Sequence, residues 1–377
     1  MVFERNIILR VTDRGKTYEF DCHVEHMLTA KKSRSWLYFC DEYGRTGTSQ
    51  CFDALRFKFN GKKQHGLLST DGLQVTAMPR RGGERAATCE VVDADGLQKK
   101  VDRAVRLLQS VGNGYDGDIE VAYSGGKDSD VCLRLAQMAG IRYRAIYKNT
   151  TIDPPGTIAH AQVGGAEIIR PKESFFELVA QMGYPNHQQR FCCRFLKEYK
   201  VLDKAVMGVR KSESTKRDKQ YNEPTECRYY GPESDPASHV EAIYPILYWT
   251  DCDVINFIEQ QGIKLHPRYY REDGTIDPKQ RLGCMCCPLA YYKKRIKYFK
   301  AYPRMVRQYI RAGKRFRDTH PDVETITMYA DVYEWFTRDV FFETQKKWDA
   351  HKNTLFGDDM DYKAFLESYF NVSLDGI

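Results

Sequence analysis

Residues 121–130 read Val-Ala-Tyr-Ser-Gly-Gly-Lys-Asp-Ser-Asp, and this stretch decides the fold. Just before it, residues 118–123 form a short apolar run with β-branched side chains, which predicts a buried strand. After it, apolar residues continue in a helix-forming run that stops at Gly140. A short loop, residues 124–129, therefore connects a strand to a helix.

The composition of this loop favours phosphate binding. Gly125 and Gly126 let the backbone turn tightly and approach a ligand closely. The free N–H groups and the dipole of the following helix attract an anion. The loop is not a Walker A motif, because no Gly-Lys-Ser/Thr stands at the required spacing. An ordinary strand–turn–helix with a glycine-rich turn is the alternative.

The six-residue string resembles the signature of the PP-loop ATP pyrophosphatase superfamily. Its members include adenylyl-sulfate (APS) and phosphoadenosine phosphosulfate (PAPS) reductases, tRNA thiolation enzymes and a subunit of DNA phosphorothioation systems. The resemblance implies an α/β fold, a parallel sheet with helices on both faces, of the adenine nucleotide alpha hydrolase type. It also implies that ATP or an adenylyl-sulfate binds at Ser124, Gly125, Gly126, Lys127, Asp128 and Ser129.

A second string, residues 208–217, resembles the Gly-x-Arg-x-x-Glu-Ser-x-x-Arg element of PAPS-reductase-like proteins. Its arginines, Arg210 and Arg217, can present planar forks to phosphate or sulfate oxygens. Glu213 is placed to hold an arginine, and we assign Ser214 to the nucleotide site. A solvated charge run is the alternative.

The resemblance implies four catalytic residues: Lys127, Asp128, Arg210 and Arg217. The three cations would offset the negative charge that develops on a leaving pyrophosphate, which is a preorganised electrostatic role. We expect the Lys127 side chain to contribute charge and little packing.

Composition bounds the class of protein. The chain has 377 residues, 42% hydrophobic, and no apolar run of about 18 residues, so we expect no membrane span. The N-terminus lacks the apolar core of a signal peptide, which favours a cytoplasmic location. The net charge of +7 is compatible with nucleic acid or small anionic substrates. Twelve cysteines then indicate metal, redox or catalytic chemistry more than a disulfide framework.

The sequence divides into three regions: a β-rich accessory domain (1–94), the PP-loop domain with the cysteines (95–290) and a basic helical region (291–377). In the first, residues 6–11, 17–24 and 35–40 are strand-like, and residues 79–83 form a basic loop. This domain either contacts a partner or nucleic acid, or simply packs.

Strand-like and helix-like runs alternate between residues 143 and 209, which predicts a parallel sheet covered by helices. Residues 149–155 follow its second strand, at the edge where ligands bind in such sheets. They either wall the nucleotide pocket, as in reductase relatives, or form a plain connecting loop. Thr250 and Asp253 mark a helix start.

Clustered cysteines suggest a metal centre. Cys284 and Cys287 have the two-residue spacer that lets both sulfurs face one metal or cluster. With the Cys192–Cys193 pair, they resemble the [4Fe–4S] pattern of APS reductases. We favour Cys193, Cys227, Cys284 and Cys287 as ligands, with Cys192 as the close contender. Zinc, a redox dithiol and inert buried cysteines remain the alternatives.

The resemblance ends near residue 290. APS and PAPS reductases use a cysteine near the C-terminus as nucleophile, whereas the last cysteine here is Cys287. Residues 291–317 instead hold eleven Lys or Arg and no Asp or Glu, and Pro303 splits them into two helices. This pattern favours contact with a nucleic-acid backbone, and a solvated helix face is the alternative. Residues 331–370 are expected to be helical.

Together these features favour a PP-loop enzyme that binds Mg²⁺-ATP, cleaves it between the α- and β-phosphates and transfers sulfur, onto tRNA or DNA. A [4Fe–4S] cluster would carry the sulfur or hold the fold, and a sulfur donor or redox protein would be a partner. An APS or PAPS reductase is the first alternative. A non-catalytic iron–sulfur protein that binds nucleic acid is the second.

Overall fold

The computed structural model describes residues 2–13, 16–28, 33–41, 44–51, 55–59, 62–68, 75–77, 88–93, 96–232, 234–277, 280–287, 290–323, 327–342 and 360–377. The chain forms two compact units. The first comprises Met1–Ala145 and Leu202–Arg281, and the second Ile146–Val201 and Leu282–Ile377. The glycine-rich loop of residues 124–129 therefore belongs to the first unit, and the basic helices belong to the second.

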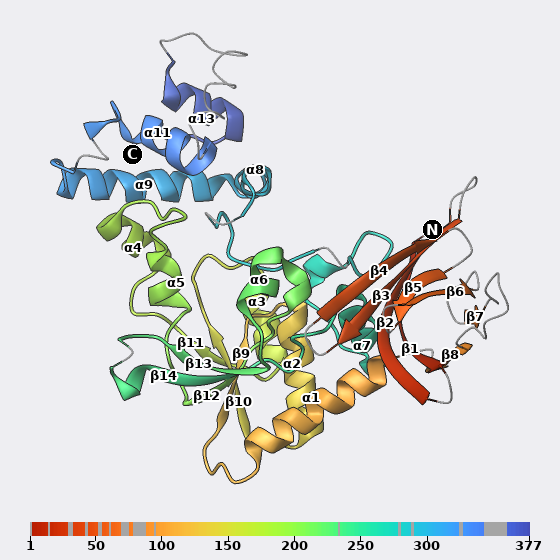
Figure 1. Ribbon diagram of the computed structural model, residues 1–377. Helices are drawn as coiled ribbons and strands as arrows, with labels where there is room; N and C mark the ends of the chain where they lie inside the picture. Colours follow the sequence, from red (N-terminus) through yellow and green to blue (C-terminus); the bar gives the residue numbers. More distant parts are fainter. Residues whose placement is uncertain are drawn as a thin grey trace. The chain divides into compact units, whose positions relative to one another are not determined.

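Antiparallel strands make up the N-terminal part of the first unit. A five-stranded sheet has the order β4-β3-β2-β1-β8 and contains β1 (Val2–Asp13), β2 (Lys16–Leu28), β3 (Ser33–Asp41), β4 (Gly44–Cys51) and β8 (Thr88–Asp93). A smaller sheet joins β5 (Leu55–Phe59), β6 (Lys62–Leu68) and β7 (Val75–Ala77). The expected β-rich character is confirmed (Figure 1), while the basic loop 79–83 lies outside the described residues.

A six-stranded sheet follows, in the order β11-β10-β9-β12-β14-β13. Its strands are β9 (Ile119–Tyr123), β10 (Tyr143–Lys148), β11 (Glu167–Ile169), β12 (Lys204–Val206), β13 (Thr225–Tyr229) and β14 (His239–Ile243). β12 runs parallel to both β9 and β14, and β10 runs parallel to β11, whereas the edge strand β13 is antiparallel to β14. The predicted α/β class is therefore confirmed.

Helices alternate with these strands, as the sequence predicts. They are α1 (Leu97–Gly112), α2 (Lys127–Ala139), α3 (Thr157–Val163), α4 (Phe175–Met182), α5 (Phe191–Leu196), α6 (Thr215–Gln220) and α7 (Asp251–Gln261). Local signals set their ends: Gly140 closes α2 in the left-handed conformation with φ 65°, and Thr250 and Asp253 form a capping box at the start of α7. Strand β9 has Ile119, Val121 and Tyr123 buried, which explains its apolar run.

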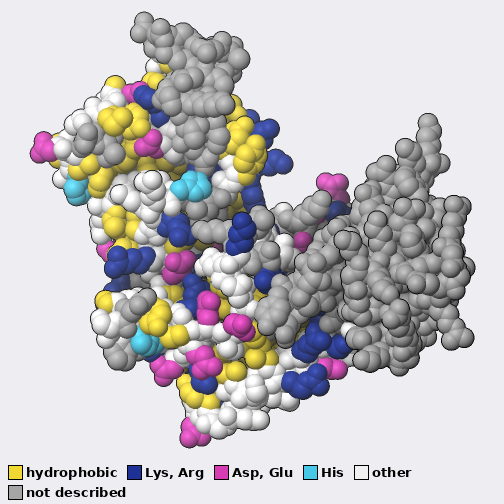
Figure 2. Space-filling view, in the orientation of Figure 1, with side chains coloured by type: hydrophobic (Ala, Val, Ile, Leu, Met, Phe, Trp, Pro, Cys, Tyr) yellow, Lys and Arg dark blue, Asp and Glu magenta, His cyan; other side chains and the backbone are white. Residues whose placement is uncertain are grey.

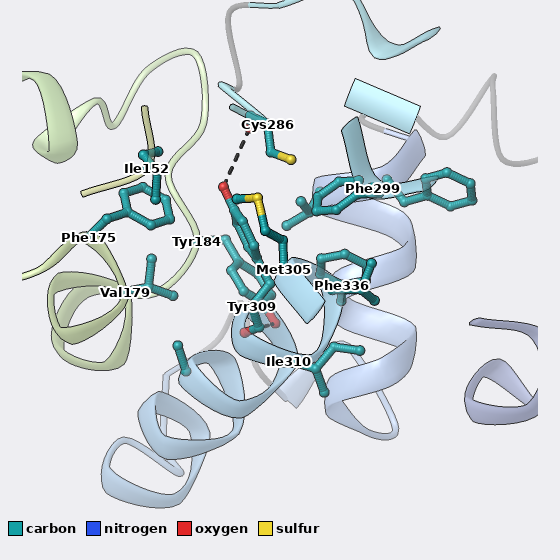
Figure 3. Close-up of a cluster of buried hydrophobic side chains, with 14 of the residues drawn as sticks. Ile152, Phe175, Val179, Tyr184, Cys286, Phe299, Met305, Tyr309, Ile310 and Phe336 are labelled. Carbon is teal, nitrogen blue, oxygen red and sulfur yellow. Dashed lines mark hydrogen bonds between the residues drawn. The ribbon is translucent and has the colours of Figure 1, made fainter. Parts of the chain in front are cut away.

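The second unit is built on a large apolar core beneath its C-terminal helices. These are α8 (Tyr292–Ala301), α9 (Pro303–Thr319), α11 (Val332–Trp335) and α13 (Tyr362–Phe370), with a π-helical turn, η4, at Phe336–Phe342. Tyr309 of α9 is central in Figure 3, and its hydroxyl donates to the carbonyl of Cys286. Gly313 is required in α9, because a Cβ there would lie 2.1 Å from the Tyr184 hydroxyl.

This core shows why the C-terminal region is helical. Pro303 begins α9 at the position where a missing N–H is tolerated, and it separates α8 from α9 as predicted. One face of α9 is buried and the other is charged. None of the helices that the structure describes is both long enough and apolar enough to span a membrane.

Candidate functional site

The loop of residues 124–129 connects β9 to α2 and is held by its own side chains. Gly125 has φ 71°, a conformation that favours glycine, and Gly126 is the N-cap of α2. The Ser129 hydroxyl donates to the Gly126 carbonyl at 2.7 Å and accepts from the Ser124 N–H at 3.2 Å. The Lys127 N–H donates to the Tyr269 hydroxyl at 3.1 Å. The predicted strand–loop–helix is confirmed, and its turn is preorganised by these bonds.

Two buried cations lie at this loop, Lys127 within it and Arg210 against it, and the carboxylates of Asp128 and Asp251 hold them; we call these four residues the inner network. Arg210 donates from Nε to Asp128 Oδ1 at 2.6 Å and from Nη2 to Asp251 Oδ1 at 2.7 Å. Lys127 Nζ lies 3.7 Å from Asp128 Oδ2 and 3.9 Å from Asp251 Oδ1. The side chains of Arg210 and Lys127 are only 0% and 2% exposed. Both cations are therefore fixed in place by the protein.

Burial and charge act in opposite directions on these cations. Burial lowers the pKa of Lys127 below its usual value, and Asp128 only partly offsets it. Burial also disfavours the charge on Arg210, but Asp128 and Asp251 more than compensate and raise its pKa. Lys127 is thus well packed, so our expectation that it contributes little packing is wrong.

Gly208 explains how the 208–217 segment comes so close to the loop. A Cβ at Gly208 would lie 2.9 Å from the carbonyl carbon and oxygen of Asp128, a distance that real Cβ atoms do not show. Only glycine therefore lets Arg210 approach the first turn of α2 from this side. The glycine of the second string is required by this packing.

Two further arginines, Arg217 and Arg281, meet at Glu213, and we call these two arginines the outer arginine pair. Arg217 forms an ion pair with the Glu213 carboxylate. Arg281 donates from Nη2 to the Glu213 carbonyl at 3.0 Å, and its Nη1 lies 3.8 Å from Glu213 Oε1. Arg217 and Arg281 are 39% and 52% exposed, whereas Glu213 is 8% exposed. Ser214, which we assigned to the nucleotide site, accepts from the Arg217 N–H and caps α6.

Sequence reasoning missed Asp251, Tyr269 and Arg281 at this site. Asp251 directly follows the helix-capping Thr250, and that helix start was its only signal. Arg281 comes just before the Cys284–Cys287 segment, and no spacing rule connects it with residues 210–217. These residues join the site only because the chain folds back on the loop.

Four cysteines of the second unit lie close enough to influence one another's ionisation. Cys192 donates a hydrogen bond to Cys193, which raises the pKa of Cys192 and lowers that of Cys193 to about 7. The charges of Cys284 and Cys287 raise the pKa of Cys192 further. We call these four residues the cysteine group. Within the described part of the chain, no three His, Cys, Asp or Glu side chains stand in a metal-binding arrangement.

A lysine accompanies the cysteine group. Lys197 is an exposed residue, and although partial desolvation of its ammonium group lowers the pKa, the charges of Cys284, Asp153, Cys193 and Cys287 outweigh this effect and raise it. Cys227 is not part of the group. It lies on β13 in the first unit, with its side chain exposed.

The loop of residues 149–155 contacts the cysteine group. The Cys284 thiol donates to the Thr150 hydroxyl at 3.6 Å, and the Met285 N–H donates to the Ile152 carbonyl at 2.8 Å. Asp153 accepts from the Tyr147 hydroxyl at 2.5 Å and from the Thr150 N–H at 3.2 Å. This loop therefore braces the Cys284 segment, a role that neither sequence-based interpretation of it included.

The basic residues of α8 and α9 separate into structural and exposed ones. Arg295 is buried, Arg307 donates to the carbonyls of Ser373 and Asp375, and Arg317 donates to the carbonyls of Tyr329 and Ala330. Seven others are exposed: Lys293, Lys297, Lys300, Arg304, Arg311, Lys314 and Arg315. Figure 2 shows dark blue side chains where Figure 1 draws α8. We call these seven residues the basic face.

Comparisons with known proteins concern the domain that contains this loop. No curated protein matches the chain. One similar solved structure is the Candida glabrata FMN adenylyltransferase in complex with FMN and the ATP analogue AMPCPP, at 14% identity and a TM-score of 0.33. That likeness covers 50% of this chain and 65% of the other, less than two thirds, and is too weak to carry an argument. Residues 118–290 match the phosphoadenosine phosphosulfate reductase domain. The resemblance to this family, a member of the PP-loop superfamily, is therefore confirmed over these residues, as the two strings predicted.

Proposed function

We propose that this chain is a PP-loop enzyme that binds Mg²⁺-ATP at residues 124–129 and cleaves it between the α- and β-phosphates. The observation that carries the proposal is the inner network, in which the carboxylates of Asp128 and Asp251 hold Lys127 and Arg210 in fixed positions at the loop. Fixed cations stabilise developing negative charge without reorganising during the reaction. The domain family adds support, because its name describes an adenine nucleotide substrate.

The proposed reaction is adenylyl transfer. An acceptor oxygen attacks the α-phosphorus, the bond to the bridging oxygen of the β-phosphate breaks, and pyrophosphate leaves on the loop. The acceptor loses a proton and becomes adenylated. A sulfur nucleophile then displaces AMP from the adenylated acceptor. The basic face supports nucleic acid, tRNA or DNA, as that acceptor, since exposed Lys and Arg bind a phosphate backbone.

We propose the cysteine group as the site of a [4Fe–4S] cluster. The donor types fit, because thiolates suit a cluster or zinc and the charge of Lys197 complements them, but the four side chains, all among the described residues, do not stand in a metal-binding arrangement in this structure. Such a cluster would supply sulfur or redox chemistry, or hold the fold. The set we propose here is Cys192, Cys193, Cys284 and Cys287, which all lie in the second unit, whereas Cys227 of our first set is exposed on β13 of the first unit.

The test of the function uses anaerobically purified protein with Mg²⁺-ATP labelled at the α-phosphate and bulk tRNA or DNA as acceptor. Pyrophosphate and AMP should form, and ADP should not. Lys127→Met should lower the rate strongly while keeping most of the buried volume, and Lys172→Met, at an exposed position, should leave it unchanged. Formation of ADP would contradict the proposal.

A second candidate is an adenylyl-sulfate reductase, which the family name favours. This activity would be established instead if the protein bound neither ATP nor nucleic acid, but released sulfite from APS or PAPS with a thiol reductant.

The cluster has its own test. Anaerobic protein should be brown, with absorbance near ~400 nm that reductant bleaches. Cys192→Ser and Cys284→Ser should remove the colour, and Cys227→Ser should retain it. Loss of colour in Cys227→Ser would restore our first ligand set, and colourless protein with bound zinc would leave the zinc alternative.

A further inference from the structure

The outer arginine pair brings together two segments that are distant in sequence. Arg217 is on α6, and Arg281 lies just before the Cys284 segment. Both meet Glu213, whose carboxylate forms ion pairs with the two guanidinium groups and whose carbonyl accepts a hydrogen bond from Arg281. Glu213 is 8% exposed, so its carboxylate is largely withdrawn from water between the two arginines. This geometry fixes the two guanidinium groups near each other.

The chain also fixes this pair relative to the phosphate loop. Arg210, which contacts Asp128, is the N-cap of the short 3₁₀ turn η1 (Lys211–Glu213), and the Glu213 N–H donates to the Arg210 carbonyl at 3.4 Å. One turn therefore connects the inner network to Glu213. Burial lowers the pKa of Lys127, and the positive charge of Arg281 acts in the same direction, which indicates that Arg281 lies within electrostatic range of the loop.

The two sets of cations differ in what they offer a ligand. In the inner network, Lys127 and Arg210 are balanced by Asp128 and Asp251, and their side chains are almost fully buried. At Glu213, one carboxylate holds two guanidinium groups that are 39% and 52% exposed. The guanidinium groups that a polyanion bound at the loop can reach are therefore those of Arg217 and Arg281. A guanidinium fork suits two oxygens of one phosphate.

We propose that Arg217 and Arg281 form a second anion subsite that binds the terminal phosphate of a nucleoside triphosphate, with Glu213 as the residue that positions both arginines. This inference rests on the proposed function, in which the loop holds the pyrophosphate portion of ATP. In this proposal, Arg217 and Arg281, which lie outside the loop, make the protein bind a nucleoside triphosphate more tightly than a monophosphate. Arg281 then belongs to the nucleotide site, although the sequence gives no signal for it.

Binding measurements with a non-cleavable ligand test the subsite. The probe is α,β-methylene-ATP with Mg²⁺, compared with AMP, by calorimetry on the full chain. Arg281→Gln should weaken binding of the triphosphate about 10- to 100-fold, as expected for loss of a charged hydrogen bond, and that of AMP less than about twofold. Arg271→Gln is the matched control, since Arg271 is 53% exposed in the same unit and pairs with Asp277. It should change neither affinity.

Glu213 is tested by the ratio of the two affinities. Glu213→Gln should lower the preference for the triphosphate over AMP, and Glu213→Asp should restore part of it. A purely structural role for Glu213 would weaken both ligands alike and leave the ratio unchanged, which would overturn its positioning role.

The outcomes separate the subsite from the function it rests on. If Arg281→Gln weakens both ligands equally, or neither, while the unchanged protein binds the triphosphate, the subsite is wrong and ATP binding stands. If the unchanged protein binds neither ligand, the proposed function fails, and the subsite fails with it.

Discussion

The inner network and the basic face both present Lys and Arg side chains, but in opposite physical settings. Lys127 and Arg210 are 2% and 0% exposed and lie within 4 Å of carboxylates. On the basic face, Lys293, Lys297, Arg304, Arg311 and Lys314 are exposed, and within the described part of the chain none of these five forms an ion pair. The first set is fixed, and the second is free to exchange its counterions.

Because of this difference, the buried and the exposed cations have different electrostatic roles. A buried cation that has lost its water must keep its carboxylate partners, so it acts at short range and in one geometry. An exposed cation contributes little to stability but attracts a polyanion through counterion release, and this attraction weakens with salt. In the proposed function, the same residue types would therefore serve catalysis in one unit and association in the other.

The largest effect should come from breaking the inner network. Arg210→Leu leaves Asp128 and Asp251 without their guanidinium partner, and should lower the free energy of unfolding by about 3 kcal/mol. Asp251 is 48% exposed, so most of this loss should come from Asp128. Denaturant unfolding measures it, with Arg304→Leu as the exposed control.

Arg304→Leu should change the free energy of unfolding by no more than about 0.5 kcal/mol. Equal losses in the two variants would remove the contrast between buried and exposed cations on which the comparison rests.

A smaller effect is expected on nucleic-acid binding. The double variant Lys297→Gln/Arg304→Gln removes two charges from the basic face, and should flatten the dependence of log affinity on log salt by about two units. Fluorescence anisotropy with tRNA or duplex DNA over a salt series measures this slope. The matched control is Arg103→Gln/Arg106→Gln, which removes two exposed charges from α1. An equal change in that control would show a general charge effect and no binding face.

The smallest effect is a proton taken up on nucleotide binding. The pKa of Lys127 lies below its usual 10.5 in the folded protein because of burial. An added phosphate favours the charged form and raises this pKa again, so binding at a pH near the folded-state pKa should take up a fraction of a proton. Calorimetry in buffers of different ionisation enthalpy measures that fraction, and Lys127→Met should abolish it.

The same shift sets the sign of a stability effect. Since the unfolded chain holds the Lys127 proton more tightly, the contribution of this residue to stability should rise with pH between the folded pKa and 10.5. The opposite slope would mean that the carboxylates outweigh burial in the inner network.

Much of the architecture could be predicted because its signals are local. Periodicity and turn residues give the strand before the loop, the break at Gly140, the alternation after residue 143 and the split at Pro303. The two family strings located the reductase-like domain that the comparison finds at residues 118–290. Three residues of the site, Asp251, Tyr269 and Arg281, could not be predicted from the sequence. They join the site through contacts between segments that are distant in the chain.

The strand–loop–helix at residues 119–139 follows from the sequence, since a strand, two glycines and a helix start are all encoded within a few residues. The sequence also states which residue types are present: thiols, guanidinium groups and lysines. What each of them contacts depends on the folded chain. Arg210 and Arg217 look equivalent in one string, but folding buries the first between two carboxylates and leaves the second partly exposed beside Arg281. Burial depends on which distant segments pack against a side chain, and that is a property of the whole chain.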